Sequence, residues 1–92
     1  MALLDEVKDE LKITWDDEDS SLLRMISRAK DNIDTLIGVE LDYETNSQAQ
    51  TLFLNYCRYD YNNALEYFED NFHKEILRLQ FQEAIKNARQ EG

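Results

Sequence analysis

The stretch that decides the fold is DDEDSSLLRMISRAKDNIDTLIG, residues 16–38. Its acidic start suits the positive end of a helix dipole, and Asp16 or Asp17 is the predicted N-cap. Gly38 follows the last turn, where a left-handed C-terminal cap is expected. The stretch predicts an amphipathic helix, because its apolar residues recur at helical steps of four and three: Leu22, Ile26, Ala29, Ile33 and Leu36.

Helical spacing continues toward the N-terminus. Apolar residues at helical intervals predict a short helix over residues 3–12, with acidic side chains on its remaining surface. The next three residues, 13–15, interrupt the pattern with β-branched and aromatic side chains. We interpret them as a connector whose Trp15 fills the core.

The sequence after Gly38 predicts one loop and two further helices. The loop covers residues 39–46, and Asn46 or Ser47 caps a third helix that ends near Glu69. After a break or kink at residues 70–71, a fourth helix extends from about Phe72 to Arg89. The expected fold class is all-α: a small bundle of about four helices in a single domain over residues 1–92.

Composition excludes several classes of function. The 92 residues include 10 Lys and Arg against 20 Asp and Glu, so the net charge is −10. This charge argues against binding DNA or an anionic membrane, since both need a basic surface. One cysteine and one histidine exclude an internal disulfide and a Cys-rich zinc site. No apolar segment is long enough to span a membrane and no secretory signal pattern is present, so we expect a soluble, intracellularly made domain without a membrane partner.

The last two predicted helices each carry two apolar faces, which is more apolar surface than a 92-residue bundle is expected to cover. On the fourth helix, one face holds Phe72, Ile76 and Leu79, which we predict to pack on the core. The opposite face is predicted to contact another subunit or a partner protein, and a second surface is possible on the outer side of the third helix. The predicted interface residues are Leu77, Phe81, Ile85, Arg78, Arg89, Leu54, Tyr61 and Leu65.

No set of residues predicts catalysis, a metal site or a cofactor. The acidic turn lacks the central glycine and the twelfth-position glutamate of a calcium loop. Cys57 is expected to be a small core residue, and His73 a surface or cap residue. The turn around Ser20 and Ser21 resembles the modification site of acyl carrier proteins weakly, because an extra serine separates Asp19 from the following leucine. We therefore expect no enzyme, and keep a carrier protein modified at Ser20 or Ser21 as one alternative.

Several segments resemble one protein family. Residues 3–13, LLDEVKDELKI, precede an acidic turn and a long helix that ends in a glycine at position 38. This order resembles the head–tail connector, or adaptor, proteins of tailed bacteriophages and prophages. Two later segments are similar to members from phages of Gram-positive bacteria: NALEYF at 63–68 and the segment from Asn71 to Gln80.

The resemblance implies a structural virion protein at the head–tail interface, assembled in the host cytoplasm. It would form a portal-matched, dodecameric ring beneath the portal protein, complete the head and join it to a stopper or tail-completion protein. DNA would pass through the ring without sequence-specific binding, which the acidic composition favours. An acidic DNA mimic that occupies a DNA-binding protein is the second alternative.

Overall fold

The part of the chain that the structure describes contains five α-helices and one short 3₁₀ turn. A computed structural model describes the backbone of residues 3–91 and the side chains of residues 3–88. The all-α prediction is confirmed, with five helices where about four were expected. The elements in chain order are α1 (Leu3–Leu11), α2 (Asp19–Ile37), α3 (Ser47–Tyr61), η1 (Leu65–Tyr67), α4 (Phe68–Asn71) and α5 (His73–Glu91).

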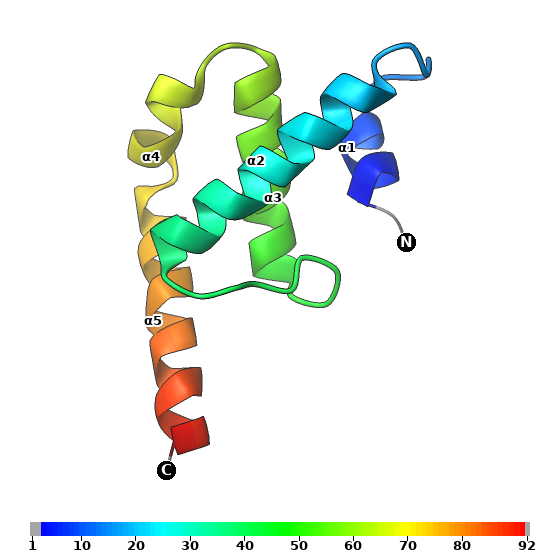
Figure 1. Ribbon diagram of the computed structural model, residues 1–92. Helices are drawn as coiled ribbons and strands as arrows, with labels where there is room; N and C mark the ends of the chain where they lie inside the picture. The colour runs from blue at the N-terminus through cyan, green and yellow to red at the C-terminus, as the bar shows by residue number, and fades with distance from the viewer. Residues whose placement is uncertain (1–2, 92) are drawn as a thin grey trace.

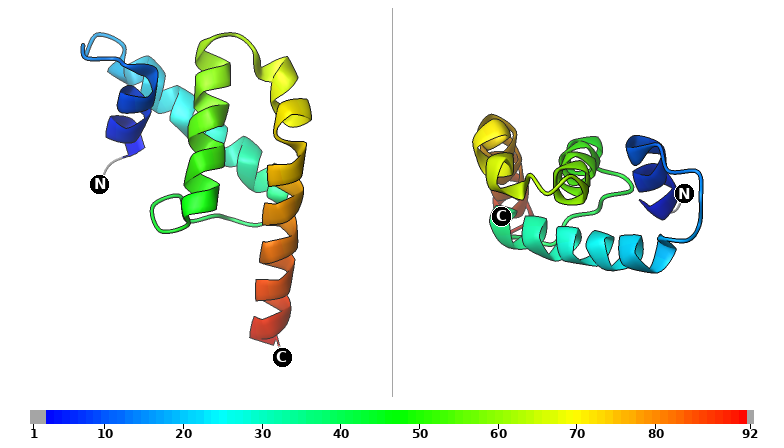
Figure 2. Two further views of the ribbon diagram at one scale, coloured as in Figure 1. Left: turned by 180° about the vertical axis from the view of Figure 1, so that it is seen from behind. Right: turned by 90° about the horizontal axis from the view of Figure 1, so that it is seen from above.

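The helices form two layers (Figure 1, Figure 2). In one layer α1, α3 and α5 lie side by side, with α3 and α5 antiparallel. In the other layer α2 crosses all three and contacts each of them. The C-terminal part of α5 extends past the loop that joins α2 to α3, which gives the molecule its long dimension of 48 Å.

The predicted stripe of α2 forms the centre of the core. Leu22, Ile26, Ala29 and Ile33 are all buried, and Leu36 packs against the core from its edge. The core is completed by side chains from the other long helices, among them Val7, Phe53, Cys57, Ile76 and Leu79. Because α2 supplies one continuous apolar face, it holds the three helices of the other layer together.

Two predicted caps are confirmed. Gly38 adopts a left-handed conformation with φ of 97°, and its backbone N–H donates to the carbonyl of Asp34. The side chain of Asn46 accepts from the backbone N–H groups of Gln48 and Ala49, both at 3.1 Å. These bonds satisfy backbone groups that the ends of α2 and α3 would otherwise leave unpaired.

The predicted N-cap of α2 is wrong. Glu18 occupies the cap position and its side chain makes no capping hydrogen bond. Asp16 instead pairs with Lys8, whose ammonium lies 2.7 Å from the carboxylate of Asp16 and 2.9 Å from that of Asp19. Hydrogen bonds from Lys8 lower the pKa of Asp16, and those to Asp16 and Asp19 raise the pKa of Lys8. The acidic turn therefore links α1 to α2 instead of capping α2.

Trp15 does not fill the core as predicted. Its side chain is 46% exposed, whereas Ile13 is buried at 5%. Lys12 adopts a left-handed conformation, with φ of 61°. The N–H of Ile13 then donates to the carbonyl of Lys8, which closes the end of α1 in a Schellman motif and turns Ile13 inward. Trp15 lies two residues later and points outward.

The predicted third helix ends eight residues early. Asn63 adopts a left-handed conformation with φ of 57° and terminates α3, and the N–H of Ala64 donates to the carbonyl of Tyr59. The chain then turns through η1 and α4. The predicted break near residue 71 exists only as one non-helical residue, Phe72, between α4 and α5.

An aromatic cluster joins α3 to the reversed chain. Phe68 makes edge contacts with Tyr56 and Tyr59 at ring separations of 5.0 and 5.8 Å, and it stacks on Phe72 at 5.0 Å. The Asn71 amide donates to the Tyr59 hydroxyl at 2.9 Å. Phe68 is thus buried, at 1% exposure. The turn at Asn63 is the reason, because it resets the direction of every later side chain.

Candidate assembly surface

The outer face of α5 carries an exposed apolar stripe. Leu77 is 49% exposed, Phe81 68% and Ile85 40%. These three residues, called the outer stripe below, follow at steps of four and so lie on one face of the helix. The opposite face of α5 is the one that packs inward: Ile76 and Leu79 are buried, and Phe72 is packed against the core. The structure thus exposes one apolar face of α5 and buries the other.

Basic side chains flank the outer stripe. Lys74 and Arg78 are exposed and lie on the same half of α5 as Leu77 and Phe81. The ion pairs among the described side chains use Lys8 and Arg28 as their cations, so Lys74 and Arg78 have no acidic partner there. The side chain of Arg89, also predicted to lie in the interface, is outside the described residues. The outer stripe therefore combines apolar area with positive charge.

Contacts along the inner face hold α5 in place. The amide of Gln80 donates to the carbonyl of Leu36 at 2.8 Å, which ties the middle of α5 to the end of α2. One turn later Glu83 is still buried at 9%. The outer stripe therefore lies on a helix that is held against the bundle. The C-terminal end of the stripe lies on the part of α5 that extends away from the bundle (Figure 1).

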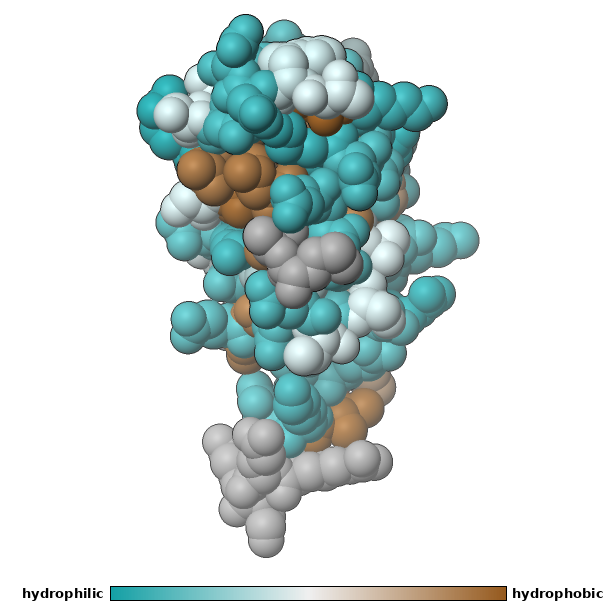
Figure 3. All heavy atoms as spheres, turned by 90° about the vertical axis from the view of Figure 1, so that its right-hand side faces the viewer, coloured by the Kyte–Doolittle hydropathy of each residue, from teal (hydrophilic) through white to brown (hydrophobic). Residues whose placement is uncertain are grey.

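A second exposed aromatic feature lies at the other side of the molecule. The indole N–H of Trp15 donates to the Glu18 carboxylate at 2.7 Å, and the hydroxyl of Tyr61 donates to the same carboxylate at 3.3 Å. Desolvation and then the charge of Glu18 raise the pKa of Tyr61. We call Trp15, Glu18 and Tyr61 the aromatic corner. The side of the molecule that carries α1 is otherwise mainly hydrophilic, with its largest hydrophobic patch in the upper half (Figure 3).

Of the predicted surface on the third helix, the structure leaves only Tyr61 at the exposed aromatic corner. Leu54 and Leu65 are half-buried and pack against the core. The sequence pattern did not indicate Trp15 and Glu18 as surface partners of Tyr61. The three-residue spacing between Trp15 and Glu18 was the available signal, but Tyr61 is 43 residues from Glu18 in sequence.

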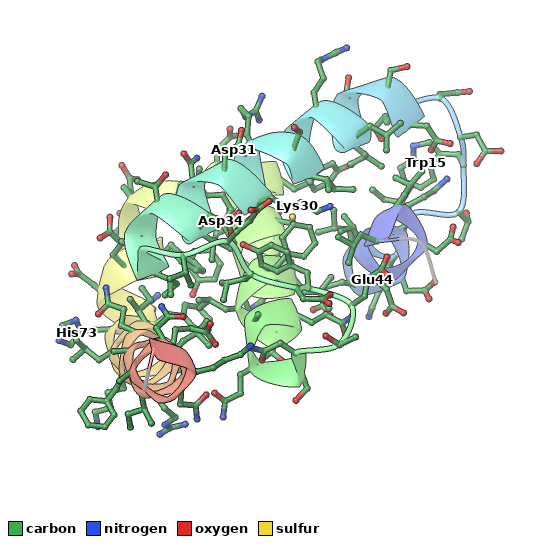
Figure 4. All side chains as sticks on the ribbon, turned by 60° about the horizontal axis from the view of Figure 1, so that its bottom comes forward. Trp15, Lys30, Asp31, Asp34, Glu44 and His73 are labelled. Atoms are coloured by element: carbon green, nitrogen blue, oxygen red, sulfur yellow. The ribbon has the colours of Figure 1, made fainter. Side chains whose placement is uncertain are left out.

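Two of the connecting segments carry clusters of acidic residues. One is the turn between α1 and α2, and the other is the loop between α2 and α3, where Glu40, Asp42 and Glu44 lie opposite the last turns of α2. Figure 4 shows Asp31 and Asp34 on α2 and Glu44 on the loop. The described residues contain no group of three or more side chains suited to hold a metal ion.

The residues considered for chemistry lie apart. Cys57 is buried at 1%, and burial raises the pKa of its thiol to about 12, so the thiolate is disfavoured. His73 is exposed at the start of α5. Ser20 and Ser21 are exposed in the first turn of α2. Among the helices of residues 3–91, none has the length and apolar character needed to cross a membrane.

The fold and the exposed surfaces define a class: a small all-α protein with a projecting helix that presents an unpaired apolar and basic face. The sequence of this chain matches the family described as phage gp6-like head-tail connector protein over residues 1–90. The chain therefore belongs to this family of structural connector proteins, and the predicted resemblance is confirmed. Its place is the virion head–tail interface, among portal and tail proteins. Searches of curated proteins and of solved structures found no match.

Proposed function

We propose that this protein assembles as a dodecameric ring beneath the portal, completes the head after DNA packaging and joins it to the stopper or tail-completion protein. Assembly would take place in the host cytoplasm. Family membership over residues 1–90 supports the connector role. The observation that carries the proposed assembly is the outer stripe, because Leu77, Phe81 and Ile85 remain exposed on a helix whose other face is buried. Exposed apolar area of this kind on a small protein is typical of an interaction surface.

The charge of the chain suits a passage for DNA. Twenty acidic side chains against ten basic ones give each subunit a net charge of −10. An acidic surface repels phosphate, so DNA moves past it without being held. The same charge favours contact with basic surfaces on a portal or stopper.

Complementation of a phage or prophage that lacks this gene tests the proposal. The wild-type chain is expected to restore infectious particles, whereas cells without it are expected to accumulate packaged heads that do not join tails. Phe81→Asp should fail to complement. Gln82→Asp is the matched control, because Gln82 is an exposed neighbour outside the outer stripe. Full complementation by Phe81→Asp would contradict the proposed role of the stripe.

The two alternative functions have direct tests. A carrier protein would gain the mass of a prosthetic arm on Ser20 or Ser21 in cells that contain a phosphopantetheinyl transferase, and we expect the unmodified mass. A DNA mimic would be recovered bound to a basic DNA-binding protein, and we expect recovery with the portal.

A further inference from the structure

We infer that the outer stripe of α5 in one copy docks on the aromatic corner of the next copy. This inference rests on the proposed ring and names the two surfaces that would form its repeated contact. The stripe contributes Leu77, Phe81 and Ile85. The corner contributes Trp15 and Tyr61, which share the carboxylate of Glu18.

The two surfaces lie on opposite sides of the subunit. Viewed from above, α5 lies at one end of the layer, α1 at the other, and α3 between them (Figure 2). Figure 4 places His73, at the start of α5, and Trp15 at opposite sides of the molecule. A contact between two different patches is heterologous, so it repeats from copy to copy and closes into a ring when the rotation permits.

The charges of the two surfaces are opposite. The stripe is flanked by Lys74 and Arg78, neither of which has an ion-pair partner among the described residues. The turn that carries the corner includes Asp16, Asp17 and Glu18. Lys8 pairs with Asp16, whereas Asp17 is exposed. Docking would therefore bring unpaired basic side chains to unpaired acidic ones.

The aromatic corner and the outer stripe also carry side chains of the types that form strong protein contacts. Trp15 is 46% exposed and Tyr61 36%, so each presents part of its ring to solvent. Their hydrogen bonds to Glu18 fix both rings before any contact forms, which reduces the entropy lost on docking. Aromatic rings and an arginine such as Arg78 are the residue types that dominate interface energies. Arg78 can also lie over an aromatic face in a cation–π contact.

The charge distribution favours a second copy of this chain as the partner of the outer stripe. Copies with a net charge of −10 repel one another unless a basic surface on one meets an acidic surface on the next. The N-terminal 19 residues hold eight acidic and two basic side chains, whereas residues 71–92 hold three acidic and four basic ones. The α5 segment therefore combines a slight positive charge with the outer stripe, so it can approach the acidic turn, and both surfaces belong to the same chain.

Site-directed cross-linking tests this contact in the full-length protein. Thr14→Cys places a thiol beside Trp15, and Ala84→Cys places one on the flank of the outer stripe, one turn after Phe81; both positions are exposed. The two variants are mixed at high concentration with a short bis-maleimide. We expect a 14–84 cross-linked dimer in the mixture and none with either variant alone. Thr35→Cys, exposed on α2, is the control for random collision. The buried thiol of Cys57 is expected not to react.

Charge reversal gives an independent readout. Asp17→Lys and Arg78→Glu should each weaken self-association about tenfold, measured by sedimentation equilibrium, because each brings like charges together. The double variant reverses both surfaces at once and should recover association to within about threefold of wild type. Recovery in the double variant is not expected if the two residues lie in separate contacts.

The outcomes separate this inference from the proposed function. Rings that form without a 14–84 cross-link, or with an 84–84 cross-link instead, overturn the inference and leave the connector role standing. A chain that complements the phage defect but stays monomeric at high concentration and on the portal also overturns it. If the wild-type chain fails to complement the phage defect, this result contradicts the connector role, whichever cross-link is found.

Discussion

Aspartate substitutions at Phe81 and Ile76 distinguish the outward face of α5 from the face that holds the fold. Phe81 is 68% exposed and Ile76 is 6% exposed. Full burial of a large apolar side chain is worth about 1.5–3 kcal/mol, and only about a third of Phe81 is covered. With the lower helix propensity of aspartate, Phe81→Asp should cost about 0.5–1.5 kcal/mol of unfolding free energy.

Ile76→Asp should cost far more. It removes most of the burial energy of an isoleucine and places a carboxylate, or a neutral acid with a raised pKa, in an apolar site at a further cost of about 2–7 kcal/mol. A domain of 92 residues is stable by about 5–14 kcal/mol in total. The substitution therefore removes a large part of the stability and is expected to leave the chain mainly unfolded.

Circular dichroism during thermal and urea unfolding measures both effects, with Gln82→Asp as the control for a new charge on α5. We expect Phe81→Asp and Gln82→Asp to show cooperative transitions near that of wild type, and Ile76→Asp to lack native helix at 25 °C. If Phe81→Asp unfolds the subunit as severely as Ile76→Asp, both faces of α5 are internal. The assembly surface would then have to be sought at the aromatic corner, which includes the exposed Tyr61 of α3.

Four further substitutions test the caps and the residues considered for chemistry. Lys12→Gly relieves a left-handed conformation at the end of α1 and should raise stability by up to about 1 kcal/mol, seen as a higher melting temperature; a lower one would contradict the assigned Schellman motif. Asn46→Ala removes the acceptor for two backbone N–H groups of α3 and should cost about 1 kcal/mol in urea unfolding, and an unchanged midpoint would refute the cap. Cys57→Ala and His73→Ala should both keep complementation in the phage assay, and loss of function in a folded variant would point to a chemical role.

The elements that the sequence predicted well are those with a regular local pattern. The stripe of α2 and its terminal Gly38 lie within one stretch, so helical period and cap chemistry were sufficient. The two faces of α5 follow from the same period, which is why Phe72, Ile76 and Leu79 were correctly assigned to the core. Such patterns depend on residues a few positions apart.

The predictions that were wrong concern positions where the local sequence was compatible with more than one conformation or contact. Asn63 ends α3 in a conformation that glycine adopts more readily, so the pattern gave no strong stop signal. Asp16 does not cap α2; its carboxylate accepts a hydrogen bond from Lys8, eight residues earlier in the sequence. The aromatic corner joins Trp15 and Glu18 to Tyr61 across 43 residues, and only the tertiary fold brings them together.

The most direct test of the connector role is the composition of the complex formed with the portal. The full-length chain is mixed with the purified portal ring of the phage or prophage that encodes it, and the mass of the complex is measured by native mass spectrometry. The connector role predicts one added dodecameric ring of this chain per portal, and loss of that ring with Phe81→Asp but not with Gln82→Asp. A portal that stays bare at saturating concentrations of the wild-type chain would contradict it.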